Sequence, residues 1–172
     1  MKFFKIFMGT VIIISILVGF VMLIEVLKLY STTDKVEYKT KSACWAAFTV
    51  VDLDVLAHRH LISNEENRDI YIKKTSAEKV IKDTIKENLI LNSSYYPLES
   101  SFLLKDYPVK IDRLEIYNPN QIPIFAPNGK ALNNTAVYIE LRFPLKIKFV
   151  GPVYKKITLV VDTKSFYSQF QK

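Results

Sequence analysis

The hydrophobic pattern begins with an unbroken apolar run at residues 6–24, IFMGTVIIISILVGFVMLI, which contains no charged residue. Lys2 and Lys5 precede this run, and Glu25 and Lys28 follow it. Since an α-helix rises 1.5 Å per residue, the run would form a helix of roughly 28 Å, close to the hydrocarbon thickness of a bilayer. A surface helix of a soluble domain keeps one polar face, and this run has none. The pattern therefore predicts a membrane-spanning helix at 6–24.

A cleaved signal peptide is the alternative for this run. Signal peptides usually have 7–15 apolar residues followed by a small-residue cleavage motif. Here the run is longer, and the next residues, EVLKLYSTTDK, contain no Ala-x-Ala motif. We therefore expect an uncleaved single-pass anchor in the cell membrane. Because the flank at 1–5 is short and basic, we place the N-terminus in the cytoplasm and the C-terminal domain outside.

Beyond the anchor, a stripe of mostly small or apolar residues continues at spacings of three and four, as on one face of a helix. The stripe predicts that the anchor helix extends over 25–62. Its small centre would let another backbone approach closely. Three interpretations remain open: the stripe packs on the chain's own sheet, it packs on another subunit, or the helix is broken. The stripe comprises Val26, Leu29, Thr33, Val36, Thr40, Ala43, Ala47, Val50, Asp54, Ala57 and Leu61.

Proline and glycine divide the rest of the chain, since neither occurs in 20–96 and all seven prolines lie in 97–152. The first part is therefore predicted to be helical, and the second to consist of strands and turns. A second helix is expected at 76–91, with Thr75 and Glu78 as a capping box. Its apolar face would be formed by Ala77, Val80, Ile81, Thr84, Ile85 and Leu89.

Alternating apolar and polar positions predict three strands in the second part. These strands are expected at 109–116, with an irregularity near Arg113, and at 137–143 and 157–161, with turns at Pro127-Asn128-Gly129 and Gly151-Pro152. The expected fold class is α+β, with the anchor extending into a long helix, a second helix, and a small antiparallel sheet of three or four strands. The expected divisions are a cytoplasmic flank (1–5), the anchor (6–24), its helical extension (25–62) and an extracytoplasmic domain (63–172).

The charge is basic and unevenly distributed. The chain has 24 Lys and Arg against 17 Asp and Glu, a formal net charge of +7, and residues 141–172 hold Asp162 as their one acid. Lysine far outnumbers arginine, whereas nucleic-acid readers rely on bidentate arginine, so we expect no nucleic-acid partner. Diffuse lysine charge suits an anionic lipid surface or cell-wall polymer, and an ordinary solvated surface is the alternative.

Few residues suggest a catalytic or metal-binding site. Asp54 and His58 lie four residues apart, and His60 and Glu65 nearby could complete a metal site. However, His58 and His60 are two residues apart, so they would point to different sides of a helix. Cys44 is the single cysteine and cannot form an internal disulfide. We expect no metal, no cofactor and no enzymatic activity.

The order of segments resembles the TadE-like family of tight-adherence pilus systems, which are minor pilin or pseudopilin-like envelope proteins of bacteria. The resemblance lies in an N-terminal apolar helix ending in IEVLKLY, the alanine-bearing KSACWAAFTVVD, a second helix, and the strands AVYIELRFP and KKITLVVDT around a Gly-Pro pair. It implies a structural or assembly role beside other pilin-like or secretion-platform subunits, without enzymatic activity.

Glu25, Lys28 and Tyr30 match the acidic, basic and tyrosine pattern that this family has at the end of the anchor. Glu25 either marks the membrane boundary or meets a basic group of the next subunit. The candidate interaction residues are Glu25, Lys28, Tyr30, Thr40, Ala43, Ala47 and Val50. Pilin-like precursors usually carry a glutamate five residues after a glycine cleavage site, whereas Ile14 and Ile24 follow Gly9 and Gly19 here. We therefore do not expect prepilin-peptidase processing.

Two other classes of function fit parts of the pattern. One is an anchored binding module of a conjugation channel or another envelope complex, which a fourth strand at 122–125 in a concave sheet would favour. The other is a membrane-tethered hydrolase, since Ser76 and Lys79 have the spacing of a serine–lysine nucleophile pair. That pair coincides with a helix start in a lysine-rich chain, so chance explains it as well.

Overall fold

The computed structural model describes residues 2–55, 70–99, 101–147 and 151–167. In chain order its elements are α1 (Lys2–Ala46), η1 (Ala47–Thr49), α3 (Lys74–Leu89), β1 (Lys110–Tyr117), η2 (Pro119–Gln121), β2 (Ile124–Phe125), β3 (Ala131–Leu132), β4 (Ala136–Ile147), β5 (Gly151–Asp162) and α4 (Thr163–Tyr167). The predicted boundaries at 1–5, 6–24 and 63–172 stay predictions.

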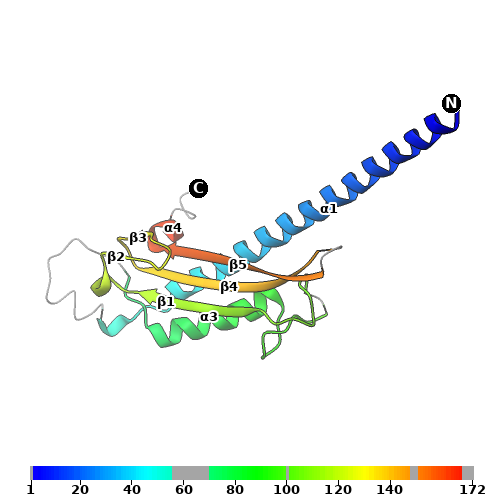
Figure 1. Ribbon diagram of the computed structural model, residues 1–172. Coiled ribbons are helices and arrows are strands. Elements are labelled where there is room, and N and C mark those ends of the chain that lie inside the picture. The colour runs from blue at the N-terminus through cyan, green and yellow to red at the C-terminus, as the bar shows by residue number, and fades with distance from the viewer. Residues whose placement is uncertain (1, 56–69, 100, 148–150, 168–172) are drawn as a thin grey trace.

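A three-stranded antiparallel sheet in the order β1-β4-β5 forms the centre of the domain, and β2 and β3 form a separate two-stranded sheet. The C-terminal half of α1 and all of α3 lie on one face of the larger sheet (Figure 1). The N-terminal half of α1 projects away from the domain, and its large apolar side chains are exposed. We call it the bare half of α1. This is the predicted α+β class, with a pilin-like layout.

Helix α1 ends earlier than the predicted extension to residue 62, which is therefore wrong. After η1 the chain becomes extended, and Val51 pairs with Ile72 in an isolated antiparallel bridge. The Lys73 amide donates to the Val50 carbonyl at 3.2 Å, and the Asp52 amide donates to the Tyr71 carbonyl at 2.7 Å. Thr49-Val50-Val51 is a β-branched run, which favours extended backbone. Helical geometry resumes at 53–55, and 56–62 lie outside the described residues.

Helix α3 begins at Lys74, and the predicted capping box of Thr75 and Glu78 does not form. Lys73 occupies the N-cap position of α3, and its side chain makes no capping hydrogen bond. Because the bridge to Val51 holds residue 72 in extended geometry, the helix starts immediately after it and Thr75 falls inside the first turn. Four residues of the predicted apolar face are fully buried at spacings of four, whereas Val80 and Thr84 are half-buried. The buried four are Ala77, Ile81, Ile85 and Leu89.

The three main strands confirm the alternating pattern. Val137, Ile139, Leu141 and Phe143 of β4 are fully buried against the helices. The pairing of β1 with β4 shifts between Ile111 and Arg113, which confirms the irregularity predicted near Arg113. Because Ile111 and Leu114 are three residues apart, only an extra residue lets both face the core.

Two turn predictions have different outcomes. Pro127-Asn128-Gly129 does turn the chain between β2 and β3, and Gly129 has the positive φ of 82° that this turn requires. Gly151-Pro152 is not a turn, because both residues already belong to β5, where Gly151 pairs with Ile147. The candidate fourth strand at 122–125 is β2, which pairs with β3 and does not join the larger sheet.

Candidate functional site

The first half of α1 presents large apolar side chains on every side. Ile16 and Phe20 are 64% and 63% exposed, and the most apolar stretch of the helix is not covered by any other part of the described chain. It is long and apolar enough to cross a membrane. A core helix of a soluble protein would be mostly buried, and this one is not. Since removing one large aliphatic side chain from water is worth about 1.5–3 kcal/mol, this surface strongly favours an apolar environment.

The three residues that match the family pattern at the end of the apolar run lie together on the exposed part of α1. Lys28 Nζ is 3.2 Å from Glu25 Oε1, so the carboxylate is already paired within its own helix. Tyr30 is 68% exposed and is not among the described residues that form the core or pack against it. An i,i+3 pair at the surface contributes only about 0.2–0.5 kcal/mol, so Glu25 remains able to exchange partners. A contact with the next subunit stays a prediction.

The small-residue stripe lies inside the chain's own domain. Thr40, Ala43 and Ala47 have no exposed surface, and Val50 is half-buried against the same core. Among the three interpretations of the stripe, the first therefore holds for its centre, because these residues pack on this chain's own helix α3 and sheet. The third holds for its far end, because the helix is broken after Ala46. They cannot at the same time receive a helix of another subunit. The candidate interaction residues thus form two separate groups, one exposed and one buried.

Two reciprocal hydrogen bonds fix α1 against α3. The Lys39 ammonium donates to the Asn88 carbonyl, and the Asn88 side-chain amide donates to the Lys39 carbonyl at 3.1 Å. The stripe also encloses the thiol of Cys44, whose pKa burial raises to about 12. Cys44 is therefore protonated and inaccessible, as expected of a packing residue.

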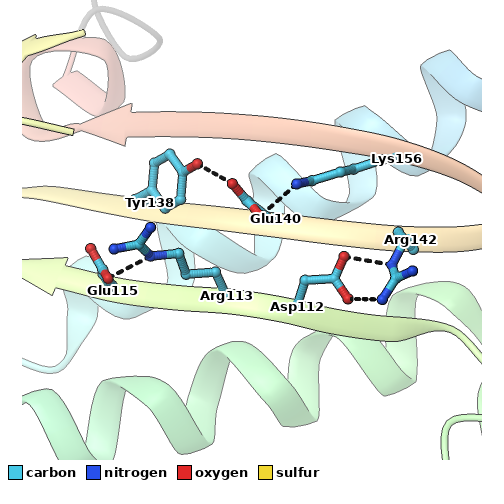
Figure 2. Close-up of polar contacts among 7 residues, drawn as sticks. All are labelled: Asp112, Arg113, Glu115, Tyr138, Glu140, Arg142 and Lys156. Carbon is cyan, nitrogen blue, oxygen red and sulfur yellow. Dashed lines mark hydrogen bonds and ion pairs between the residues drawn. The ribbon is translucent and has the colours of Figure 1, made fainter. Parts of the chain in front are cut away.

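The outer face of the sheet carries a ladder of ion pairs that the sequence did not reveal (Figure 2). Arg142 binds Asp112 in bidentate geometry, with Nε–Oδ2 at 2.6 Å and Nη2–Oδ1 at 2.7 Å. The second pair is Arg113 Nε with Glu115 Oε1 at 2.6 Å, and the third is Lys156 Nζ with Glu140 Oε2 at 2.6 Å. Three acids and three bases thus neutralise one another on this face.

Two tyrosines complete the ladder, since the hydroxyl of Tyr117 donates to Glu115 and that of Tyr138 donates to Glu140. Burial, together with these hydrogen bonds, raises the pKa of each tyrosine to about 12. For Glu140, hydrogen bonds from Lys156 and Tyr138 lower the pKa. For Glu115, burial raises the pKa, but the bonds from Tyr117 and Arg113 outweigh it and the net shift is downward. The charges of this face are therefore fixed near neutral pH, which suits a structural or docking surface.

The ladder follows from strand register. Glu140 stands opposite Thr158 on β5, and Lys156 reaches it diagonally from two residues away. Alternation identified Glu140 and Arg142 as outward-facing, but their partners on β1 and β5 depend on the pairing register and on the bulge at Asp112. A register prediction would have needed the turn geometry between strands.

The other candidate residues do not assemble into a site. Asp54 is exposed, whereas His58, His60 and Glu65 lie outside the described residues. Within the described ranges, no group of three metal-binding side chains occurs. Ser76 and Lys79 both lie on α3, at the surface or close to it.

Comparisons with protein-family models, with curated proteins and with solved structures found no match.

Proposed function

We propose that this chain is a single-pass, membrane-anchored, pilin-like subunit with a structural or assembly role in a bacterial pilus or secretion apparatus. The observation that carries the proposal is the composition of α1. One continuous helix is apolar and bare over its first half and belongs to the core of the domain over its second half. The proposal assigns no catalytic role and no cofactor.

The physical role follows from that helix. Since no break separates its halves, a bilayer that holds the first half also sets the position of the domain. Partner subunits would meet the exposed surfaces, because the small-residue stripe is occupied within the chain. The exposed first half of α1, together with the exposed Tyr30 just beyond it, is available for lateral contacts with other membrane helices. The TadE-like resemblance supports the same assignment, with the N-terminus in the cytoplasm and the domain outside.

The binding-module alternative receives less support. A fourth strand curving the main sheet would favour it, and β2 pairs only with β3. A long helix that runs from an apolar half directly into the domain favours the pilin-like proposal.

Topology can be tested by cysteine labelling, because the buried Cys44 gives little background. Asn128→Cys places a thiol on the exposed turn after β2, and Lys5→Cys places one before the apolar run. In intact cells, a membrane-impermeant maleimide should label Asn128→Cys but should label Lys5→Cys only after permeabilisation. The reverse pattern would contradict the proposed orientation, and recovery of the full-length chain as a soluble protein would contradict anchoring.

Assembly needs a separate test. A photo-crosslinking residue in place of Tyr30 should capture neighbouring subunits in intact membranes, whereas the same residue in place of Asn128 serves as a matched exposed control. Defined adducts at Tyr30 that depend on a neighbouring secretion or pilus component would support the assembly role. Absence of adducts from Tyr30, with anchoring intact, would count against lateral assembly.

A further inference from the structure

One end of the domain faces the bare half of α1. Helices α1 and α3 run antiparallel, because Lys39 bonds Asn88 near the end of α3, while η1 is followed by the bridge to the start of α3. The loop after α3 therefore returns toward the bare half, and Lys39 lies 5.8 Å from the ring centroid of Phe102 in that loop. Figure 1 shows the loop and the adjoining ends of β4 and β5 on the side where α1 leaves the domain.

This end comes close to the apolar run. Leu29 of α1 already packs against the domain core. Leu29 is five residues beyond Ile24, which corresponds to roughly 8 Å along the helix. The polar headgroup layer on each side of the hydrocarbon core has a comparable depth. If α1 spans a bilayer to Ile24, this end of the domain therefore lies at the level of the headgroups.

The side chains at this end are aromatic and basic. Tyr107 and Tyr154 meet edge to face with ring centroids 6.4 Å apart, and Lys110 Nζ lies 5.5 Å from the Tyr154 centroid. Both tyrosines are more than a third exposed, as is Val153. Lys110, Lys146 and Lys155 are exposed and form no ion pair within the described parts of the chain. We call Tyr107, Lys110, Lys146, Tyr154 and Lys155 the membrane-facing patch. Its residues share this end of the domain but lie on both faces of the sheet, since Tyr154 stands opposite Pro144 and Lys155 opposite the buried Phe143.

Acidic groups do not neutralise the patch. Asp112 is held by Arg142, and Glu99 is paired with Lys105 at 3.0 Å. Asp106 is the remaining carboxylate of the loop, against three lysines. Tyrosine is enriched at membrane interfaces because its ring is apolar and its hydroxyl remains hydrated, and lysines near a surface are attracted to anionic lipids.

We propose that the membrane-facing patch is a second contact with the bilayer, in which the two tyrosines sit at headgroup level and the three lysines bind anionic phospholipid headgroups. This inference depends on the proposed function, since it requires α1 in the membrane. Two attachments fix the tilt of the domain relative to the bilayer, whereas the helix alone would leave this tilt free to vary. The patch would thereby decide which way the ion-pair ladder faces.

The test uses the full-length chain in nanodiscs, either zwitterionic or containing anionic phosphatidylglycerol. A nitroxide is attached at Val153→Cys, and labels at Asn128→Cys and Ile16→Cys serve as references. Collisions with a water-soluble nickel reagent report exposure to solvent. In anionic discs, accessibility at Val153→Cys should fall by about threefold relative to zwitterionic discs, while Asn128→Cys should not change. The triple variant K110Q/K146Q/K155Q should abolish the fall, and the distal control K73Q/K79Q/K164Q should retain it.

The outcomes separate the two proposals. Nickel access to Ile16→Cys as high as that to Asn128→Cys would overturn anchoring by α1 and with it the proposed function. Protection of Ile16→Cys together with accessibility at Val153→Cys as high as that at Asn128→Cys in both disc types would leave the anchor standing and overturn the lipid contact. Protection of Val153→Cys that is insensitive to lipid charge and to the triple variant would overturn the lysine-headgroup recognition.

Discussion

The two halves of α1 reverse the usual relation between hydrophobicity and burial. In the first half, large apolar residues such as Ile16 and Phe20 are mostly exposed. In the second half, the smaller Thr40 and Ala43 have no exposed surface at all, and the same holds for Ala47, which follows α1 directly. Hydrophobicity thus indicates the solvent that a segment prefers, whereas side-chain size indicates how closely another backbone packs on it. The same helix serves both purposes because its composition changes along its length.

The largest expected effect comes from giving the first half a polar character. Ile12→Lys/Ile16→Lys puts two charges near the middle of the apolar run, and each costs about 2.5–3.5 kcal/mol at the centre of a membrane helix. We expect the full-length protein to move from the carbonate-resistant membrane fraction to the soluble or aggregated fraction. Tyr30→Lys/Tyr38→Lys adds the same charge beyond the run and should leave the protein in the membrane. Equal membrane retention of both variants would contradict the proposed division of α1 into a membrane-spanning half and a half that packs in the domain.

The second prediction enlarges a side chain in the buried half. Ala43→Leu adds three carbon atoms where α1, α3 and the sheet already fill the space, and such overpacking costs about 1–3 kcal/mol. The thermal midpoint in detergent should fall, as followed by circular dichroism. Labelling of Cys44 should also accelerate, because the opened packing exposes its thiol. Tyr38→Leu, on the exposed side of the same turns, should change neither quantity.

That second experiment also separates folding from assembly. If Ala43→Leu left the thermal midpoint and the Cys44 labelling rate unchanged but abolished the Tyr30 crosslinks, the stripe would have to act between subunits and its packing within the chain would be overturned.

Sequence patterns predicted the elements well where a local rule was sufficient. Period-two alternation located the strands, and its failure between Ile111 and Leu114 located the bulge. The end of α1 was missed because spacings of three and four continue through Val50 and Asp54, while the competing bridge from Val51 to Ile72 is a contact with a distant segment.

The candidate site was predictable to a smaller extent. Composition alone distinguishes the apolar run of α1, since residues 6–24 contain no charged residue. In contrast, the partner of Glu140 depends on strand register, and the partner of Ala43 depends on which way α3 returns. Local rules contain neither piece of information, because each is decided by packing between segments that are far apart in the chain.

A smaller effect is expected from replacing Thr40, and it should stabilise the fold, whereas Ala43→Leu should destabilise it. Its hydroxyl is buried and has no hydrogen-bond partner among the described residues. Thr40→Val keeps the shape and removes this unpaired group, so the free energy of unfolding should rise by about 1 kcal/mol. In the control Thr33→Val, the lost hydroxyl donates to the Leu29 carbonyl at 2.8 Å, so no gain is expected. A lower thermal midpoint for Thr40→Val would mean that the hydroxyl is satisfied in solution.

The ion-pair ladder on the outer face of the sheet is a third kind of region, because its charged side chains are partly exposed and already paired with one another. Changes in this ladder should have the smallest effect on stability. The pKa of Glu140 is lowered by Lys156 and Tyr138, and that of Glu115 is lowered on balance, so both carboxylates are more acidic in the folded state than in the unfolded chain. Their contribution is therefore present above the ordinary glutamate pKa of 4.5 and is lost as the pH falls below it.

The thermal midpoint should hence decline as the pH falls from 5 to 3, by a few degrees at most, because these partly exposed pairs are screened by solvent. Glu140→Gln should reduce this decline, whereas Glu87→Gln on the exposed side of α3 should reproduce the wild-type curve. Identical pH profiles for all three proteins would mean that the ladder contributes nothing to stability, and this face would then retain its charges only as a surface for partners.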